Sequence, residues 1–460
     1  MSKWSYREAL EELWRRSSYE RGLISNPFGG PERAARGLRR MRALLAELGD
    51  PHQRVPLVHV AGSKGKGSTS AFIAHSALQA GLKTGFYSSP HLHRFPERIA
   101  INGVPVADAV FADLARQVAL AASRLEAARP ELDTVTTFEM ITAMAFLAFA
   151  QERCDLAVIE VGLGGLLDAT NVIEPLATVI TRIDYEHTAV LGNTLTEIAR
   201  QKAGILRPGT PVVVSPQPSE AAAAIRQAAA DVDAPLLMGG VDWHWDGDWR
   251  SFTATGPWGA WPDLRVGIAG PHQVENACTA LAAMYELGNR HVSIPESAIR
   301  AGLRTARWPG RFERLQVNDQ EIVLDGAHTP AAARALVETW LAEIDAEAVA
   351  AIVGMGSDKD IASFLTELRP LATRIIATRA ASPRAASPAA IAAAAADLGF
   401  KVEIAPDVAS SLHFVGSGSP LLVTGSLFVA GEAREVLGVA EPDREWAAVN
   451  AAHLAGTGAP

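Results

Sequence analysis

The residues from His59 to Phe72, HVAGSKGKGSTSAF, combine glycines, lysines and hydroxyl side chains in one short stretch. Such a stretch could bind phosphate, because glycines let backbone N–H groups approach an anion and a lysine neutralises it. The strict spacing G-x-x-x-x-G-K-[ST] is not met, since Gly67 follows Lys66 and the hydroxyls come one place later. By composition alone, a flexible surface turn fits about equally well.

The elements around this stretch favour phosphate binding. LVHVAG (57–62) is a predicted strand, and a helix is predicted from about Ser68 to Ala80, so the glycines join a strand to a helix N-terminus. Lys66 would then hold a terminal phosphate, while a hydroxyl faces magnesium. The predicted loop residues are Gly62, Ser63, Lys64, Gly65, Lys66, Gly67, Ser68 and Thr69.

Short apolar runs alternate with helical patterns through the first half of the chain. Strands are predicted at 83–89, 156–162, 177–184 and 210–216, and helices at 137–152 and 194–206. Continuously apolar strands between amphipathic helices indicate a parallel sheet that is covered on both faces. The stretch 241–264, rich in Trp, Gly and Asp, predicts short antiparallel hairpins. A helix follows near 272–287.

A second α/β series begins after a Pro-Gly break within 304–315. Its strands are predicted at 321–328, 348–356, 374–380, 401–407 and 420–426. The stretch 387–399 predicts a helix with Ser387 as N-cap, Pro388 as its first residue and Gly399 beyond its end. We expect two domains, 1–306 and 307–460.

The bulk composition limits the classes of function. A chain of 460 residues with 48% hydrophobic residues can bury large cores, and a net charge of −9 argues against a nucleic-acid partner. Cys154 and Cys278 lie far apart, which indicates reduced, buried thiols. The N-terminus lacks a signal-peptide pattern, and no run of about 18 apolar residues occurs. We expect a cytoplasmic monomer without membrane contact.

Ten motifs in order resemble the folylpolyglutamate synthase/dihydrofolate synthase family of the Mur ligase superfamily. In that superfamily a glycine after the lysine is a usual loop variant. The motifs are VHVAGSKGKGST (58–69), YSSPHLHRFPERIAING (87–103), TTFEMITAMAFLAF (136–149), VIEVGLGGLLDATNVIEP (158–175), ITRIDYEHTAVLGNTLTEIARQKAGIL (180–206), HQVENACTAL (272–281), PGRFE (309–313), LDGAHTP (324–330), GMGSDKD (354–360) and TGSLF (424–428).

The resemblance implies a fold and an activity. The expected fold is α/β, with an N-terminal P-loop-type, mostly parallel sheet flanked by helices, a small antiparallel β subdomain, and a C-terminal Rossmann-like α/β domain. The implied reaction uses ATP to join a carboxylate to the amine of L-glutamate through an acyl phosphate. Such chemistry depends on charge neutralisation and positioning rather than on a protein nucleophile. The implied acceptor is dihydropteroate, the glutamate tail of a reduced folate, or both.

The resemblance also implies a metal site for two magnesium ions. Glu160 matches the family's magnesium-binding glutamate, with the hydroxyls of Ser89 and of Ser68 or Thr69 on the same ion. His187 matches a ligand of the second ion. Lys202 matches a lysine that the family carbamylates, which would turn a cation into an oxygen ligand. Read without the resemblance, Glu160 is a paired structural carboxylate and Lys202 an exposed helix lysine.

The implied ATP site spans both predicted domains. Asn276, Arg311 and Asp325 match residues that contact the base, ribose or phosphates, and His328 follows on the same turn as Asp325. Since Arg311 and Asp325 lie in the second domain, ATP is expected in the cleft between domains. Closing that cleft would protect the acyl phosphate from water.

Three positions depart from the commonest family pattern. Leu166 stands where arginine is frequent, Glu186 where aspartate precedes the histidine, and Thr329 where asparagine is usual. Leu166 removes a cation near the site, which leaves acceptor preference open. The pterin site is not defined by the sequence; HLHRF (91–95) and SYERGLISNPFGG (18–30) are candidate contributors. The Trp-rich stretch 243–261 is interpreted as hairpins with an aromatic core rather than as a pterin platform.

Alternatives from other classes remain at this stage. Another Mur-type ligase, such as one that builds a cell-wall peptide, shares the same chemistry; ERIAING and DATNVIEP favour folate. A P-loop ATPase without ligase activity would release phosphate without glutamate, and a binding protein without catalysis would lack Lys66, Glu160, His187 or Lys202.

Overall fold

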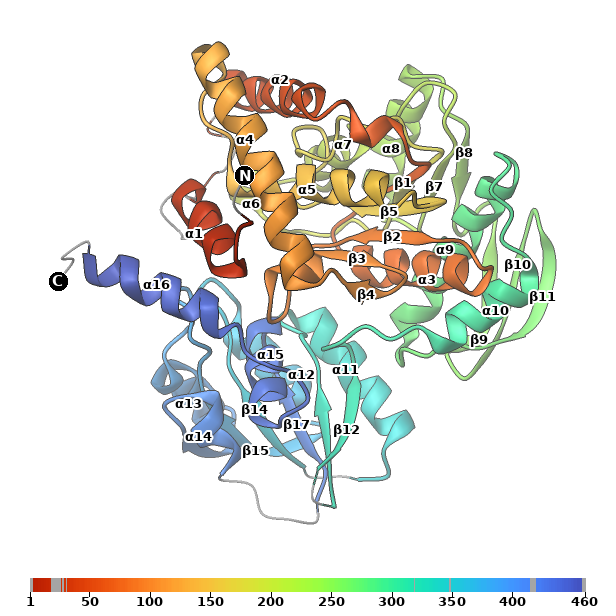
Figure 1. Ribbon diagram of the computed structural model, residues 1–460. Coiled ribbons are helices and arrows are strands. Elements are labelled where there is room, and N and C mark those ends of the chain that lie inside the picture. Colours follow the sequence, from red (N-terminus) through yellow and green to blue (C-terminus); the bar gives the residue numbers. More distant parts are fainter. Residues whose placement is uncertain are drawn as a thin grey trace.

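The computed structural model describes residues 3–17, 26, 29, 31–317, 319–346, 349–413 and 419–456. Within these ranges the strands form three sheets, of eight, three and six strands. Figure 1 shows the eight-stranded and six-stranded sheets in separate α/β bodies, with the three-stranded sheet at the side of the first. The predicted fold class is therefore confirmed.

The eight-stranded sheet has the order β4-β3-β2-β5-β1-β6-β7-β8. All neighbouring pairs are parallel except β2 with β3 and β3 with β4, which are antiparallel at one edge. The strands are β1 Leu57–Ala61, β2 Thr84–Tyr87, β3 Ile99–Ile101, β4 Val104–Pro105, β5 Leu156–Glu160, β6 Ala177–Ile180, β7 Val212–Val214 and β8 Leu236–Met238.

Helices cover both faces of this sheet, which explains why its central strands are apolar throughout. In β1, Val58 and Val60 enter one core and Leu57 enters another on the opposite face. The helices of this part are α1 Tyr6–Arg16, α2 Pro31–Glu47, α3 Lys66–Gln79, α4 Asp108–Ala128, α5 Thr137–Gln151, α6 Thr188–Leu191, α7 Leu195–Ala203, α8 Ser219–Asp231, α9 Pro271–Gly288 and α10 Glu296–Thr305.

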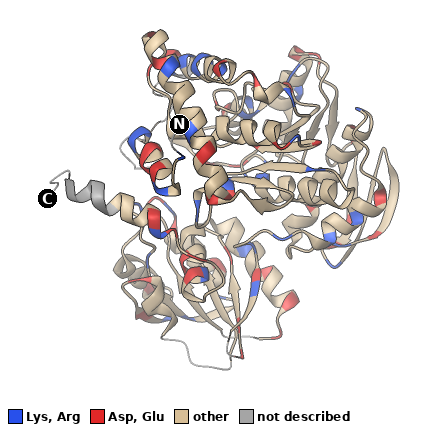
Figure 2. Ribbon diagram, in the orientation of Figure 1, with Lys and Arg blue, Asp and Glu red and all other residues tan. Residues whose placement is uncertain are grey.

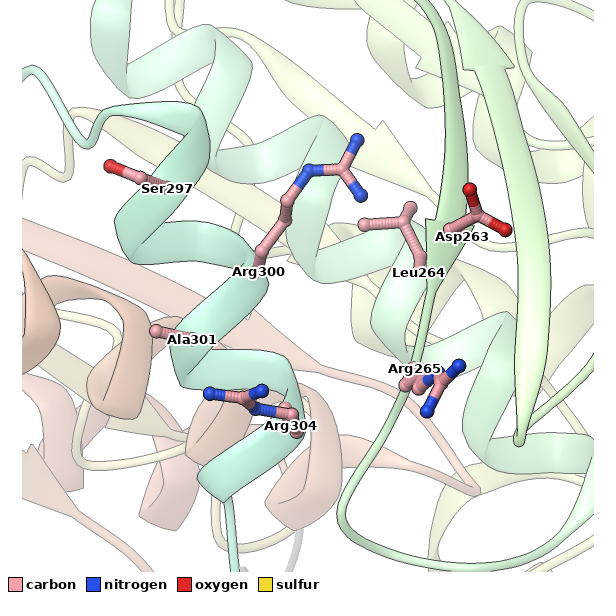
Figure 3. A pocket seen from close by; sticks show the side chains of 7 residues that line it. All are labelled: Asp263, Leu264, Arg265, Ser297, Arg300, Ala301 and Arg304. Carbon is pink, nitrogen blue, oxygen red and sulfur yellow. The ribbon is translucent and has the colours of Figure 1, made fainter.

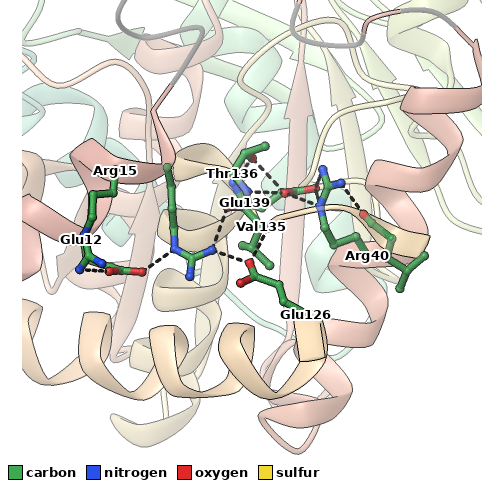
Figure 4. A network of polar contacts seen from close by, with 9 residues as sticks. Glu12, Arg15, Arg40, Glu126, Val135, Thr136 and Glu139 are labelled. Carbon is green, nitrogen blue, oxygen red and sulfur yellow. Dashed lines mark hydrogen bonds and ion pairs between the residues drawn. The ribbon is translucent and has the colours of Figure 1, made fainter. Parts of the chain in front are cut away.

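A buried polar network joins the N-terminal helices (Figure 4). The Arg40 guanidinium of α2 forms a two-pronged ion pair with Glu139 of α5, at 2.9 Å and 2.8 Å. Glu139 also closes a capping box with Thr136 at the start of α5. A second group links α1 to α4, where Arg16 bonds both Glu12 and Glu126. This network fixes the start of α5 against α2, and α1 against α4.

The Trp-rich stretch forms the three-stranded antiparallel sheet, as predicted. Its strands are β9 His244–Asp248, β10 Ser251–Gly256 and β11 Gly259–Leu264. Trp243 and Trp249 are buried in the core that α3, α9 and α10 share with the large sheet. These two indoles therefore serve packing, as the sequence interpretation favoured.

The six-stranded sheet has the order β12-β13-β17-β14-β15-β16 and is parallel except for the pair β12–β13. Its strands are β12 Glu313–Val317, β13 Gln320–Leu324, β14 Val349–Val353, β15 Ala372–Ala377, β16 Lys401–Ile404 and β17 Leu421–Thr424. The helices are α11 Pro330–Glu343, α12 Ile361–Leu368, α13 Pro388–Asp397, α14 Val408–Leu412, α15 Leu427–Val436 and α16 Arg444–Gly456. In α13, Ser387 caps the N-terminus as predicted.

The last helix, α16, returns to the N-terminal helix α1 (Figure 1). The Tyr6 hydroxyl donates to Asp443 at 2.5 Å, and the Trp14 indole donates to Asn450 at 2.7 Å. The contact between α1 and α16 therefore links the N-terminal α/β body to the C-terminal one. Acidic and basic residues are interspersed over both bodies (Figure 2). Among the described helices, none has the length and apolar character needed to cross a bilayer.

Candidate active site

The glycine loop connects β1 to α3, as predicted. The segment after β6 holds its first half: the N–H groups of Ser63 and Lys64 donate to the Arg182 carbonyl at 3.0 Å and 3.1 Å. The Ser63 hydroxyl donates to the carbonyl of Asp184 at 2.9 Å. The first N–H groups of α3 have no intrahelical acceptor. The N-terminus of α3, rather than the N–H groups of Ser63 and Lys64, is therefore the part of the loop available to phosphate.

Two glycines of the loop are required by close neighbours. Gly65 has φ +91°, and a Cβ on it would lie 2.2 Å from Oδ1 of Asn276. A Cβ on Gly67 would lie 3.0 Å from the indole Nε1 of Trp308. The extra glycine of the motif thus leaves room for Trp308, which follows α10 and covers the start of α3. Neither contact was expected from the sequence.

Lys66 and Lys202 meet at one backbone oxygen. The Nζ atoms of both side chains donate to the carbonyl of Gly62, each at 2.8 Å. Lys202 is 1% exposed and also forms an ion pair with Glu186 at 2.5 Å. Burial lowers the pKa of Lys202 to about 8, although Glu186 opposes the shift. Burial alone would raise the pKa of Glu186, but Lys66 and Lys202 more than offset this and lower it.

Glu160 ends β5 in the buried interior, beside the glycine loop. One carboxylate oxygen accepts from the N–H of Ser89 at 3.4 Å. Burial raises the pKa of Glu160 to about 7, while Lys66, the Ser89 N–H and Arg311 oppose the shift. A carboxyl in this state is stabilised as an anion by any added cation. The structure thus brings Glu160, Ser89 and Lys66 into one site.

His187 precedes α6 with a left-handed backbone, φ +45°. Burial lowers its pKa; Glu186 opposes this, and the nearby Lys66 and Lys202 add to it. The imidazole is therefore kept neutral, the form that ligates metals. Its position next to Glu186 places it at the same end of the sheet as Lys202.

The six-stranded body contributes the opposite wall of the site. Arg311 is half-buried, and its charge interacts with both Asp325 and Glu160. The Asp325 carboxylate accepts from the N–H groups of Phe312 at 2.7 Å and Ala327 at 2.8 Å, and burial raises its pKa. The site therefore includes groups from both α/β bodies.

Other predicted residues lie around this centre. Asn276, in α9, is buried and donates to Gln273 at 3.0 Å. The His328 ring pairs with the carbonyl of Gly326 at 2.9 Å, and burial lowers its pKa, with Lys64 among the nearby charges. Ser68 and Thr69 are buried in the first turns of α3. Thr69 Oγ1 has no hydrogen-bond partner among the described residues.

The three departures from the family pattern have different surroundings. Glu186 binds Lys202, as described above. Thr329 caps α11, where its hydroxyl accepts from the N–H of Ala332 at 3.4 Å. Leu166 is 42% exposed, and its backbone N–H donates to the Gln201 carbonyl at 2.7 Å. Of the three, Glu186 forms an ion pair with a predicted site residue, Lys202.

Two residues near the site were not among the site residues predicted from the sequence. Lys359 acts electrostatically on Lys64, His187 and His328, although it belongs to the quoted motif GMGSDKD. Its place in that motif was the available signal. Trp308 carried no signal, because only the three-dimensional packing places its indole against Gly67.

The donor set fits a magnesium ion in part. Glu160 is a buried carboxylate without an ion-paired cation among the described residues, and hydroxyls are available at Ser68 and Ser89. The second predicted ion has only His187 and Lys202, and Lys202 as an ammonium group cannot ligate a metal. A carbamate on Lys202 would supply the missing oxygen ligand. In the described part of the chain, no three or more His, Cys, Asp or Glu side chains are grouped so that they could hold a metal ion.

A surface cavity of about 440 Å³ lies elsewhere, between β11 and α10 (Figure 3). Its lining includes Asp263, Arg265, Arg300 and Arg304 and none of the predicted site residues. We assign the site from the converging charges and loop geometry, because a phosphate loop needs N–H groups and a lysine rather than a deep cavity.

Two family models match the chain. Residues 60–284 match the Mur ligase middle domain, and residues 310–427 match the Mur ligase glutamate ligase domain. The glycine loop, Glu160 and His187 lie in the first match, and Arg311 and Asp325 in the second. The fold and the two matched domains are those of an ATP-dependent ligase of the Mur type.

Individual relatives show which Mur-type ligases this chain is similar to. The chain is 34% identical to the dihydrofolate synthase/folylpolyglutamate synthase of Bacillus subtilis, over 87% of this chain and 95% of that protein. A crystal structure of folylpolyglutamate synthase from Thermotoga maritima superposes with a TM-score of 0.82 at 31% identity, covering 96% of this chain and 99% of that chain. E. coli FolC in complex with DHPP and ADP gives a TM-score of 0.81 at 29% identity, covering 95% and 98%.

The chain belongs to the folylpolyglutamate synthase/dihydrofolate synthase family. It is an ATP-dependent ligase that joins glutamate to folates. The resemblance drawn from ten sequence motifs is thereby confirmed.

Proposed function

We propose that ATP binds across the two α/β bodies, with its phosphates at the N-terminus of α3. The observation that carries this proposal is the meeting of Lys66 and Lys202 at the Gly62 carbonyl, beside Glu160 and within the field of Arg311. Lys66 would release Gly62 and contact the γ-phosphate. Asn276, Arg311 and Asp325 would hold the remainder of the nucleotide, with His328 next to them.

The proposed reaction has two steps. An acceptor carboxylate oxygen attacks the γ-phosphorus of ATP, so that an acyl phosphate forms and ADP leaves. The amine of L-glutamate then attacks the acyl carbon, loses a proton and expels phosphate, which leaves an amide. The cations of Lys66 and Arg311 favour the charge that develops on the transferred phosphoryl group. Docking of the two bodies would keep water from the acyl phosphate.

We further propose that magnesium is bound by Glu160, Ser68 and Ser89, and a second ion by His187 and carbamylated Lys202. Magnesium would neutralise the phosphates during transfer. A lysine pKa of about 8 supports carbamylation, because the neutral amine that reacts with CO₂ is then a substantial fraction near neutral pH. In the carbamylated state Lys202 would no longer pair with Glu186.

The acceptors are proposed to be both dihydropteroate and glutamylated reduced folates. The Bacillus subtilis relative carries both activities in its name, and the E. coli relative was crystallised with DHPP and ADP. The family match disfavours a cell-wall ligase. A panel assay tests this: ADP release is measured with L-glutamate and either dihydropteroate, tetrahydrofolate or a UDP-muramoyl acceptor. Turnover with only one of the two pteridine acceptors would restrict the proposal to that acceptor.

We also propose that the chain acts as a cytoplasmic monomer with domains at 1–306 and 307–460. The boundary is supported by the sheets, because the eight- and three-stranded sheets end before residue 307 and the six-stranded sheet begins at Glu313. Light scattering after gel filtration tests the monomer: a mass near 48.7 kDa is expected, and twice that mass would contradict it.

A further inference from the structure

In the segment that carries Ser89, one histidine forms polar contacts with the other α/β body. His93 contacts two neighbouring residues of α15. Its Nδ1 is 2.9 Å from a carboxylate oxygen of Glu435, and the Nε of Arg434 donates to its Nε2 at 3.1 Å. The His93 side chain is only 7% exposed. This is a part-buried polar contact between parts of the chain some 340 residues apart.

The hydrogen-bond roles follow from the chemistry of the partners. A guanidinium can only donate, so Nε2 of His93 must accept from Arg434. Nδ1 then carries the proton and donates it to Glu435, a charge-assisted bond. Both ring nitrogens are thus used by α15.

The segment around His93 is internally rigid. The Glu97 carboxylate accepts from three successive N–H groups, those of Leu92 at 2.8 Å, His93 at 3.1 Å and Arg94 at 2.8 Å. A Cβ on Gly431 of α15 would lie 3.2 Å from the Leu92 carbonyl, so the helix backbone also approaches this segment closely. A displacement of His93 would therefore move the segment that leads back to Ser89.

The same helix holds the turn that carries Arg311. Arg434 forms an ion pair with Glu313, and the second oxygen of Glu313 accepts from the N–H of Gly310 at 2.9 Å. Arg434 therefore links His93 on one side to the turn before β12 on the other. One residue after Gly310 stands Arg311, whose charge reaches Glu160.

We propose that His93 is a positioning residue that docks the Ser89 segment onto α15, so that Ser89 and Arg311 take their places together. This inference rests on the proposed roles of Ser89 and Arg311. When the docking is lost, each body keeps its own half of the site, but the halves are no longer held in register. Phosphoryl transfer would slow and water would reach the acyl phosphate.

Kinetics of the full chain test this with H93A, E435Q and the double variant. H93A loses both bonds of this side chain, which is expected to lower kcat about tenfold. E435Q replaces the carboxylate acceptor by a neutral amide oxygen, which weakens one of the two bonds and should lower kcat less. The double variant should fall little further, because both changes break the same contact. H93N keeps a donor toward Glu435 and should recover part of kcat. R334A, which breaks an exposed ion pair with Glu367 inside the six-stranded body, is the matched control and should leave kcat unchanged.

Hydrogen exchange of the ADP-bound proteins gives a readout that does not depend on activity. Peptides spanning 88–98 should exchange about fivefold or more faster in H93A than in the natural chain or R334A, with a smaller increase in E435Q, because docking protects them. Unchanged exchange in this segment would overturn the inference, even if the natural chain showed no ligase activity. Unchanged kcat in H93A, with the natural chain active, would overturn it as well. If the natural chain shows no turnover but the 88–98 peptides still exchange faster in H93A, the result contradicts only the proposed function.

Discussion

Lys66 and Lys202 donate to the same atom, the carbonyl oxygen of Gly62, each at 2.8 Å. Two ammonium groups on one oxygen repel each other, so the arrangement favours an anion nearby. Glu186 supplies one negative charge at Lys202, and the Lys66 ammonium makes no ion pair among the described residues. A nucleotide phosphate at the N-terminus of α3 would complete the charge balance and draw Lys66 away from Gly62.

The first prediction concerns Lys66. Lys66→Met should lower kcat/KM for ATP by about 10²- to 10³-fold, because it removes a cation from the transferred phosphoryl group. Folding stability should change by about 1 kcal/mol or less, since one hydrogen bond to Gly62 is lost. Lys83→Met, which breaks an exposed pair with Glu152, is the control and should behave like the natural chain. ADP release near the natural rate in the Lys66 variant would refute its role.

The second prediction separates a carbamate from an ammonium at Lys202. Lys202→Ala should reduce ADP release about 100-fold, and added acetate or formate should restore part of it by supplying carboxylate oxygens. Restoration by methylamine instead would show that the cation itself is needed. Full activity of Lys202→Ala would exclude both roles. Urea unfolding should be measured alongside, because for an uncarbamylated Lys202 the change leaves Glu186 without its ion-pair partner, at a cost of about 3 kcal/mol.

The third prediction tests why the loop carries an extra glycine. Gly67→Ala should raise the KM for ATP about tenfold, because the new Cβ would meet the Trp308 ring at 3.0–3.2 Å and displace the start of α3. Trp308→Phe in the same chain removes the crowding atoms and should recover most of the loss. Gly288→Ala has open space around its Cβ and should leave the KM unchanged. An unaltered KM in Gly67→Ala would contradict this, because it would mean that the Trp308 ring moves aside without displacing α3.

Some features of the fold and site could be predicted from the sequence, and others could not. The strands around the loop were predictable because burial on both faces demands continuous apolar runs, and Ser387 was predictable because capping is local. Two contacts could not be predicted, that of Trp308 with Gly67 and that of His93 with α15, because each joins elements far apart in the chain. Glu160 and Lys202 were identified only through the family resemblance, because a lone carboxylate or lysine carries no pattern of its own.

The fourth prediction is a pH dependence of stability from Glu275 in α9. Burial raises the pKa of Glu275 from 4.5 to about 7, with Arg182 opposing the shift. Because the folded pKa lies above the unfolded one, this group favours the fold fully below pH 4.5, and the benefit is lost as pH rises through 7. At about 1.4 kcal/mol per pKa unit, the loss is at most about 3 kcal/mol.

Glu275→Gln should therefore be more stable than the natural chain at pH 8 by up to about 3 kcal/mol, and nearly equal to it at pH 4. Urea unfolding of both nucleotide-free proteins at the two pH values measures the difference. An equal difference at pH 4 and pH 8 would mean that Glu275 does not titrate in this range.

The measurement that tests the central claim most directly is glutamate-dependent ADP release by the purified natural chain, with magnesium, ATP and a folate acceptor. The ligase account predicts ADP in equal amount to the glutamylated product, with dihydropteroate and with tetrahydrofolate, and little ADP when glutamate is omitted. ADP release at the same rate without glutamate, or no product with either acceptor, would contradict it.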